Sequence, residues 1–324
     1  MHRRCRISDA MLLIATFTVA ASGHAQTYPV KPVRVVSPYP PGSSADVIGR
    51  IFTPKLSEIF GRQFVIDNRG GAAGNIAGEI VAHAAPDGYT LLLLNTPLVS
   101  SQPLYKDLTF DVARDFQPIA MLGIAPHMLV VNLSSPAKSV QELIALAKAR
   151  PGKLTYASTG TGGSLHLTME MFKAQTGTSM LHVPYKGSAF TVPELIGGHV
   201  DVMFGSIPSL LPHVKSGRIR ALGVSSVKRS PVVPDVPTIA ESGLPGFESY
   251  TWLTLAGPAG TPRDVVNALN AAIAKCVQSP DIASMLANQS TEPSLMTPQE
   301  TAAFIRDEIV KWKKVIAAAG VKGE

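Results

Sequence analysis

The chain has 324 residues, of which 45% are apolar and 16% charged, and it carries a formal net charge of +6. At about 100–200 residues per domain, this length predicts two domains, each able to bury a core. The basic residues form no run and no patch interleaved with aromatic side chains. The charge therefore does not indicate a nucleic-acid-binding protein, although it suits an anionic ligand.

The first 25 residues have the parts of a secretory signal. Three arginines lie within the first six residues, a run of 12 apolar or small residues follows from Ala10 to Ala21, and Gly23 and Ala25 fit the small-residue cleavage rule. The run is shorter than the roughly 20 residues that a membrane-spanning helix needs, and no later segment approaches that length. We therefore expect residues 1–25 to be removed as a signal peptide, leaving a periplasmic protein that is not embedded in the membrane.

Apolar runs rich in β-forming residues alternate with helical patterns along the rest of the chain. The runs predict strands at 33–37, 64–66, 90–94, 128–131, 154–158, 200–204, 219–224 and 252–256. The helical patterns predict helices at 45–60, 75–84, 140–149, 164–176, 263–277 and 298–319. Such alternation is typical of an α/β fold, in which helices cover largely parallel sheets.

Two segments, 33–44 and 154–164, repeat one arrangement: a strand, a loop rich in glycine and serine, and the start of a helix. If each segment belongs to its own lobe, the two loops face one another across a cleft at the carboxyl ends of the strands, where open parallel sheets bind ligands. Backbone N–H groups and hydroxyls at the positive end of a helix suit a carboxylate or a phosphate. Neither loop matches the G-x-x-x-x-G-K-[ST] phosphate cradle, so no nucleotide cofactor is expected.

Several polar residues of these loops have two interpretations. Ser43, Ser44 and Ser164 are placed either to contact a ligand or simply to cap helices. Asp46 either favours the helix dipole or holds a water or a ligand donor group. His166 either faces the cleft or packs beneath it, and no H-E-x-x-H motif or Cys/His cluster predicts a metal site.

Two other classes of function remain open at this stage. A periplasmic hydrolase would be expected to carry a G-x-S-x-G nucleophile elbow, which is absent, but Ser158, His166 and an aspartate could assemble a triad in space. A ligand-sensing partner of a signalling receptor would use the same cleft as a transport receptor. Only a test of its partner would separate these two roles.

Several distinctive segments, in the right order, resemble the Bug-type receptors, which are the substrate-binding proteins of tripartite tricarboxylate transporters. The resemblance covers essentially the whole chain after residue 25. It is carried by residues 28–34, 38–42 with Asp46, 67–71 with Gly74 and Asn75, 86–91, 182–187, 220–224 and 235–238.

The resemblance implies a two-lobed periplasmic-binding-protein fold of type II-like topology, with two mixed or parallel sheets flanked by helices. Such receptors close on their ligand like a hinged clamp. We place the two crossings between lobes near 121–125 and 248–250, so that residues 26–123 and 250–324 form the first lobe and 124–249 the second. The implied protein is a monomer without a cofactor. It delivers a mono-, di- or tricarboxylate, an amino acid or an aromatic carboxylate to a membrane permease.

In such receptors, backbone amides and hydroxyls of both lobes bind the carboxylate, and ordered waters assist. Tyr185 and Lys186 also have a plain interpretation, as a packing residue and a surface charge. Carried over by position, the resemblance nominates Tyr39, Ser43, Ser44, Asp46, Asn95, Thr96, Ser158, Thr159, Gly160, Thr161, Gly162, Gly163, His166, Tyr185, Lys186, Phe204, Gly205 and Ser206.

Overall fold

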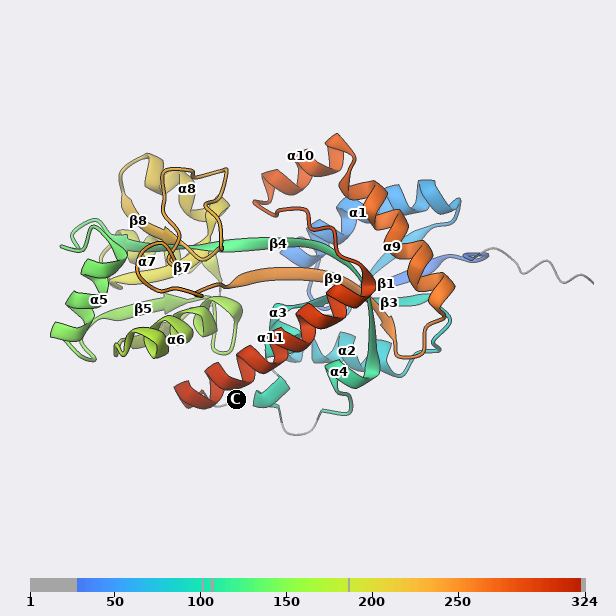
Figure 1. Cartoon of the computed structure of the whole chain (residues 1–324), viewed down its shortest axis with the longest axis horizontal. Coiled ribbons are helices and arrows are strands. Elements are labelled where there is room, and N and C mark those ends of the chain that lie inside the picture. The colour runs from blue at the N-terminus through green and yellow to red at the C-terminus, as the bar shows by residue number, and fades with distance from the viewer. Residues whose placement is uncertain (1–27, 101, 106–107, 186, 322–324) are drawn as a thin grey trace, which may run out of the picture.

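The structure is a computed structural model that describes residues 28–321, apart from 101, 106–107 and 186. The predicted signal peptide and Lys186 lie outside the described residues. The described residues form a sheet of nine strands, in the order β2-β1-β3-β9-β4-β7-β5-β6, with β8 paired to β4 off this path. The molecule is elongated, with one half of the sheet at each end (Figure 1).

The first half of the sheet is built around three parallel strands, β1 (Val33–Ser37), β2 (Phe64–Asn68) and β3 (Thr90–Asn95). Strand β9 (Tyr250–Pro258) joins them in the antiparallel direction. The helices of this half are α1 (Ser44–Phe60), α2 (Asn75–Ala82), α9 (Arg263–Val277) and α10 (Pro280–Asn288). Short helical turns occur at η1 (Ala72–Gly74), α3 (Thr96–Ser100), η2 (Gln102–Leu104) and α4 (Val112–Asp115).

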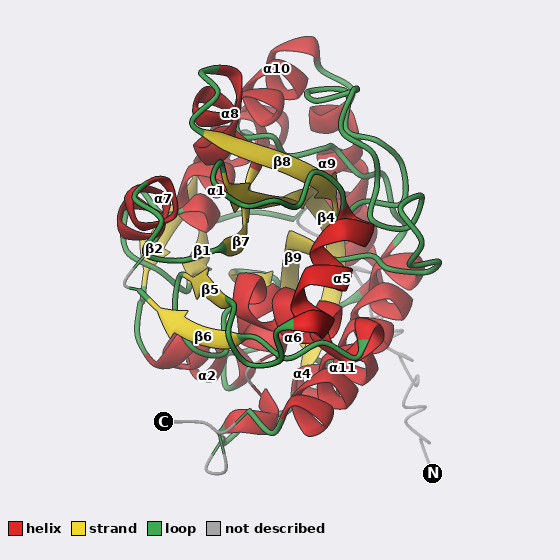
Figure 2. Ribbon diagram, turned by 90° about the vertical axis from the view of Figure 1, so that its left-hand side faces the viewer, coloured by secondary structure: helices red, strands yellow, loops and turns green. Residues whose placement is uncertain are grey.

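The second half contains β5 (Thr155–Ser158), β6 (Leu181–Pro184), β7 (Val202–Ser206) and β8 (Ile219–Val224). Strands β5, β6 and β7 run parallel to one another. The helices of this half are α5 (Val140–Ala149), α6 (Ser164–Thr176), α7 (Ser188–Ile196) and α8 (Ile207–Lys215). A view along the long axis shows helices around this group of strands (Figure 2).

Strand β4 (Phe116–Asn132) connects the two halves. Its residues 116–126 pair with β9, whereas residues 127–132 pair with β7 and β8. Both β4 and β9 run along the middle of the molecule, between its two ends (Figure 1). The exact lobe boundaries given above stay a prediction.

The long helix α11 (Pro298–Ala319) begins at a capping box made by Thr297 and Glu300. Near its start, Ile305 packs with core residues of the first half, such as Leu92 and Leu94. Near its end, Trp312, Val315 and Ile316 pack with Phe172 and other core residues of the second half. The sequence assigns residues 250–324 to the first lobe. Helix α11 lies in this range and contributes side chains to the cores of both halves.

The predicted fold class is confirmed: helices flank sheets that contain parallel strands. Strands β1 and β8 and helices α5, α6, α9 and α11 have the predicted bounds. Strand β6 and helices α7, α8 and α10 are additional elements that the sequence did not predict. In the part of the chain that the structure describes, no helix combines the length and apolar character needed to cross a membrane.

Candidate functional site

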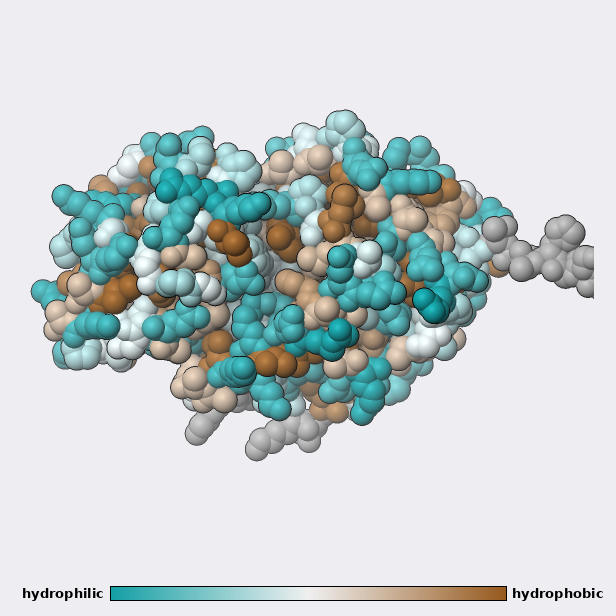
Figure 3. Space-filling model, in the orientation of Figure 1, coloured by the Kyte–Doolittle hydropathy of each residue, from teal (hydrophilic) through white to brown (hydrophobic). Residues whose placement is uncertain are grey.

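A cavity of about 340 Å³ lies between the two halves of the sheet. This volume falls in the range of about 300–1,000 Å³ that is typical of small-molecule sites. The surface is notched between the same two halves (Figure 3). The lining comes from α1, the ends of β1 and β3, the crossing strands β4 and β9, α6, β7 and the segment after α10. The lining residues are Tyr39, Ser44, Ala45, Ile48, Asn95, Pro97, Gly123, Ala125, Pro126, His127, Thr159, Ser164, Leu165, Met203, Gly205, Ser206, Thr251, Trp252, Leu253, Gln289 and Thr291.

Three of the longer helices that the structure describes begin at this cavity. Helix α1 contributes Ser44 and Ala45 from its first turn, α6 contributes Ser164 and Leu165, and Ser206 is the N-cap of α8. The first N–H groups of a helix have no acceptor inside the helix, and they carry the positive end of its dipole. Partial positive charge is therefore expected at three places in the cavity lining.

The described side chains that line the cavity are uncharged at neutral pH. Among the described residues that line it, none is Asp, Glu, Lys or Arg. Burial lowers the pKa of His127 to about 3, and the nearby Lys311 adds to this effect, so the imidazole is neutral. Burial also raises the pKa of Tyr39 to about 12, which keeps its phenol protonated. Any anion held here is therefore neutralised by dipoles and hydrogen-bond donors of these residues.

His127 belongs to a chain of hydrogen bonds beside the cavity. Its Nε2 lies 2.9 Å from Thr251 Oγ1, and its Nδ1 lies 3.3 Å from Thr168 Oγ1. Thr251 Oγ1 lies in turn 3.2 Å from Ser164 Oγ. The network ties β4, β9 and the start of α6 together, so it fixes how the second half meets the crossing strands.

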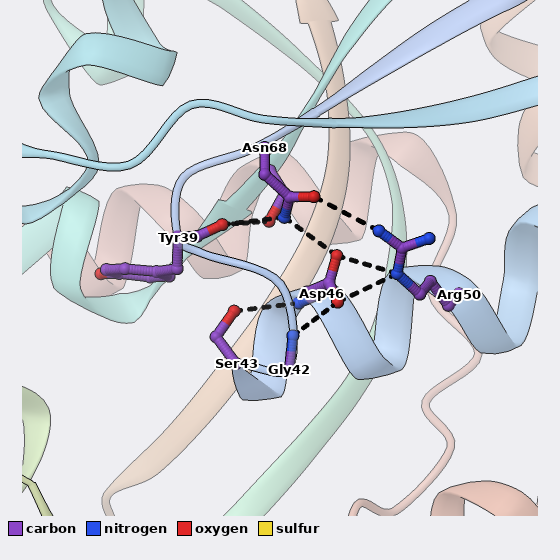
Figure 4. Close-up of polar contacts among 7 residues, drawn as sticks. Tyr39, Gly42, Ser43, Asp46, Arg50 and Asn68 are labelled. Atoms are coloured by element: carbon purple, nitrogen blue, oxygen red, sulfur yellow. Dashed lines mark hydrogen bonds and ion pairs between the residues drawn. The ribbon is translucent and has the colours of Figure 1, made fainter.

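The first loop is held by the carboxylate of Asp46, which is buried at the start of α1. This carboxylate accepts hydrogen bonds from the Gly42 N–H at 2.8 Å, from Arg50 Nε at 3.0 Å and from Asn68 Nδ2 at 2.9 Å (Figure 4). Burial alone would raise the pKa of Asp46, but these hydrogen bonds outweigh it and hold the pKa below its usual value. Ser43 Oγ caps the helix by accepting the Asp46 N–H at 3.4 Å.

The second loop is held by neutral histidines. His166 Nδ1 accepts the Gly162 N–H at 3.0 Å, and the His166 ring stacks on His182 with ring centroids 4.0 Å apart. Burial lowers the pKa of His166 to about 4, and repulsion from His182 acts in the same direction, so the imidazole is neutral. The hydrogen bond from the Gly162 N–H assigns Nδ1 as its unprotonated nitrogen. His182 Nε2 lies 2.6 Å from the buried Ser158 Oγ. Ser158 thus contacts His182, whereas the hydrolase hypothesis paired it with His166.

The structure brings six of the predicted site residues to the cavity: Tyr39, Ser44, Asn95, Thr159, Gly205 and Ser206. Others lie beside or behind it. Thr96 Oγ1 accepts a hydrogen bond from the Trp252 N–H at 2.9 Å. Phe204 packs in the core of the second half. The Tyr185 hydroxyl donates a hydrogen bond to Glu194 at 3.1 Å. The remaining described residues outside the lining are Ser43, Asp46, Ser158, Gly160, Thr161, Gly162, Gly163 and His166. Ligand contact stays a prediction for all of them.

Four lining residues with polar side chains, His127, Thr251, Gln289 and Thr291, were not anticipated from the sequence. They lie in segments without glycine-rich loops or recognisable motifs. Their common feature is their position on or beside the crossing strands, and a sequence read one segment at a time gives no signal for this.

A scan against family models matches residues 48–321 to the tripartite tricarboxylate transporter family receptor, TctC. This chain belongs to the TctC receptor family. The resemblance deduced from the sequence is therefore confirmed, and the protein is a solute-binding protein of this family.

Relatives of the TctC family support the assignment over nearly the full length. Protein BugT of Bordetella pertussis is 38% identical over 313 residues, which is 96% of each chain. The solved structure of R. palustris Rpa4515 with adipate has 36% identity and a TM-score of 0.77, and the match covers 92% of this chain and 100% of that one. MatC from Rhodopseudomonas palustris with bound malate has 31% identity and a TM-score of 0.74, covering 89% and 100%.

Proposed function

We propose that this TctC-family protein binds a small carboxylate in the cavity between its halves and delivers it, in the periplasm, to a tripartite tricarboxylate transporter. The observation that carries the proposal is the convergence of three helix N-termini on a cavity whose described lining contains no charged side chain. Such a site favours an anion, because first-turn N–H groups and hydroxyls donate to it without a counterion.

Energetics support a carboxylate as the bound group. A hydrogen bond to a charged acceptor is worth about 1.5–3 kcal/mol, roughly twice the value for a neutral one. Several such bonds offset the cost of taking one carboxylate out of water, whereas a buried cation would face the positive ends of three helices. Relatives with similar chains bind adipate and malate, which agrees with this class.

The site residues that we propose for carboxylate binding are those that line the cavity with donor groups. Ser44, Ser164 and Ser206 supply donors at the three helix starts. Tyr39, Asn95 and Thr159, which belong to the predicted set, add a hydroxyl, an amide and a second hydroxyl. Asp46 and His166 act through the loops, which they hold in place from behind.

Calorimetry with matched acids and amides tests the proposal. Succinate and succinamide have nearly the same shape, but only succinate is charged, and adipate and adipamide form a second such pair. We expect the protein to bind at least one of the acids, with the matching amide weaker by about tenfold or more. Equal affinity for acid and amide, or preference for the amide, would contradict carboxylate binding.

Export and delivery require separate tests. The intact mass of the protein recovered from the periplasm should correspond to a chain that begins after residue 25. Loss of the transporter's membrane subunits should abolish uptake of the bound carboxylate. If uptake persists and the protein instead co-purifies with a signalling receptor, the sensing alternative is favoured.

A further inference from the structure

Helix α11 passes from the first half of the molecule to the second, and Glu308 lies where it does so. The helix runs obliquely across both halves (Figure 1). Ile305, one turn before Glu308, packs in a core cluster of the first half. Trp312, one turn after it, packs in the core of the second half. Glu308 is therefore on the part of α11 that lies between the two cores.

The buried carboxylate of Glu308 connects two tryptophans. Its Oε2 accepts hydrogen bonds from the indole N–H of Trp252 at 2.8 Å and from the indole N–H of Trp312 at 2.9 Å. Its Oε1 pairs with Lys311 Nζ, which also lies over the ring of Trp312, 4.9 Å from the ring centroid. A single carboxylate oxygen thus joins strand β9 to the core of the second half.

Trp252 connects this carboxylate to the cavity. It lies on the crossing strand β9 and belongs to the cavity lining. Its ring meets Phe304 of α11 edge-on, with the ring centroids 5.6 Å apart. The preceding residue, Thr251, lies 2.9 Å from His127 and 3.2 Å from Ser164 at the start of α6. A displacement of β9 at Trp252 would therefore change both the cavity wall and the support of α6.

Stability alone does not account for a buried carboxylate at this place. Replacement of a buried ion pair by apolar side chains of similar volume is often neutral or stabilising. An apolar side chain cannot, however, accept two N–H groups from different parts of the fold. Hydrogen bonds to a carboxylate are directional and strong, so those of Glu308 fix the positions of Trp252 and Trp312 relative to α11.

We propose that Glu308 is a positioning residue for ligand binding, which holds the two halves in the arrangement that forms the cavity. This inference rests on the proposed function, because its test measures carboxylate affinity. Glu308 lies outside the cavity lining that the structure describes, so it acts through Trp252 on β9 and Trp312 in the second half. Without it, the halves populate other arrangements, and the apparent affinity falls with the fraction of molecules that keep the cavity intact.

Calorimetry with succinate and adipate measures this effect. Glu308→Ala removes the acceptor of both indole N–H groups. It should weaken binding of the acid that the wild type binds by about tenfold, within the range of about 5–150-fold that is typical of coupling between sites. Trp312→Phe keeps an aromatic ring but deletes one of the two donors, so it should weaken binding by about threefold.

Two further variants serve as controls. Glu308→Gln keeps a side-chain oxygen that can accept both indole N–H groups, so it should bind the acid within about twofold of the wild type. Asp307→Ala removes the neighbouring carboxylate of α11, which is exposed, and should also change the affinity by less than about twofold.

NMR of the indole groups separates a positioning role from a merely structural one. The chain has two tryptophans, and both of their indole N–H groups donate to Glu308. In the ¹⁵N-labelled wild-type protein, the bound acid should shift both indole signals, although Trp312 lies outside the described lining. In Glu308→Ala, the Trp252 signal should still shift, whereas the Trp312 signal should no longer respond.

The inference is overturned if Glu308→Ala, shown by a cooperative urea transition to be folded, binds the acid as the wild type does. It is also overturned if Asp307→Ala weakens binding as much as Glu308→Ala, or if the Trp312 signal responds equally in Glu308→Ala and the wild type. If Glu308→Ala does not fold, wild-type affinity in Trp312→Phe overturns it. These results leave the proposed function intact, whereas failure of the wild type to bind either acid removes both.

Discussion

The two loops that face the cavity share one local arrangement but are supported by different chemistry. In the first loop, the carboxylate of Asp46 accepts hydrogen bonds from Gly42, Arg50 and Asn68. In the second, a neutral imidazole of His166 accepts the Gly162 N–H. One loop therefore depends on a negative charge being present, and the other on a positive charge being absent. The same strand, loop and helix start can be stabilised in either way.

The difference extends behind the second loop. Glu170 lies beneath the stacked histidines, where it accepts the hydroxyl of Tyr156 and lies 2.6 Å from Lys173 Nζ. This acid interacts with Lys173 and Tyr156, while His166 Nε2 lies 3.8 Å away from it. The ion pair of Glu170 and Lys173 thus lies behind the loop, next to the neutral histidines that hold it.

Removal of the Asp46 carboxylate, which supports the first loop, should have the largest effect on stability and on carboxylate affinity. Asp46→Ala deletes a buried acceptor of several hydrogen bonds to charged and polar donors, so we expect a loss of about 2–3 kcal/mol in the free energy of unfolding. Carboxylate affinity should fall about tenfold or more, because Ser44 and Ala45 begin the helix that Asp46 anchors. Urea unfolding and calorimetry measure the two effects.

Glu58→Ala is the matched control for this change. Glu58 lies on the same helix and pairs with Lys55 at 2.8 Å, but this pair is at the surface. Its removal should change the free energy of unfolding by less than about 0.5 kcal/mol. If Asp46→Ala were as mild as Glu58→Ala, the carboxylate would not hold the loop.

Deletion of a single backbone N–H at the start of α1 or of α6 should have a smaller effect on carboxylate affinity, and the effect should be similar for the two helices. Proline is well tolerated at the first position of a helix, and Ser43 has the extended conformation that suits a residue before proline, with φ −68° and ψ 159°. Ser44→Pro therefore deletes one N–H of α1 and should weaken carboxylate binding about tenfold. Ser164→Pro, at the start of α6, should act in the same way.

Ser44→Ala separates the N–H from the hydroxyl, because it keeps the first and removes the second. We expect calorimetry to show a change of about twofold at most for this variant, well below the effect of a charged hydrogen bond. If alanine and proline at residue 44 weakened binding equally, the hydroxyl rather than the helix N-terminus would bind the ligand.

The pH dependence of the free energy of unfolding distinguishes the support by His166 from the support by Asp46. The pKa of His166 is lowered from 6.5 to about 4 in the folded protein, so unfolding is accompanied by proton uptake in this range. The stability contributed by the neutral imidazole is complete above pH 6.5 and is lost as the pH falls through 4. The pKa of Asp46 is also lowered, but the stability that its carboxylate contributes is lost only at more acidic pH, when the pH falls below the usual pKa of a carboxyl group.

His166→Asn tests this assignment, since an asparagine oxygen can accept the Gly162 N–H without titrating. Urea unfolding between pH 7 and 4 should show a shallower loss of stability in the variant than in the wild type. His127, whose pKa is lowered to about 3, accounts for part of the remaining slope. Identical slopes in the variant and the wild type would show that His166 is not the titrating support.

Much of the fold and part of the site could be predicted from the sequence, because the signals for them are local. The loop that ends β5 and the helix α6 are defined by their glycines and by a continuous helical pattern. Strand β6 has only four residues, lies at the edge of the sheet and exposes Leu181, so it lacks the buried apolar run of a central strand. Helices α7 and α8 contain Pro193 and Pro212, which disrupt the helical pattern.

The rest of the site depends on contacts between distant segments. His127 contacts Thr251 across 124 positions of the chain, and residues 289–292, which follow α10, pair with β4 from more than 160 positions away. Only the pairing of β4 with β9 and with residues 289–292 brings these side chains to one cavity. Gly123 was not recognised either, because its role is to leave room for a segment far along the chain.

The dependence of carboxylate affinity on salt tests the central claim most directly. Dipoles and donors buried in a cavity are screened far less than exposed ion pairs, for which the screening length falls from about 30 Å at 0.01 M to about 3 Å at 1 M salt. Calorimetry with the preferred carboxylate at about 0.02 M and about 0.5 M salt should therefore give dissociation constants within about twofold of each other. A loss of affinity of about tenfold or more at the higher salt would show that exposed cationic side chains, and not helix N-termini, bind the ligand.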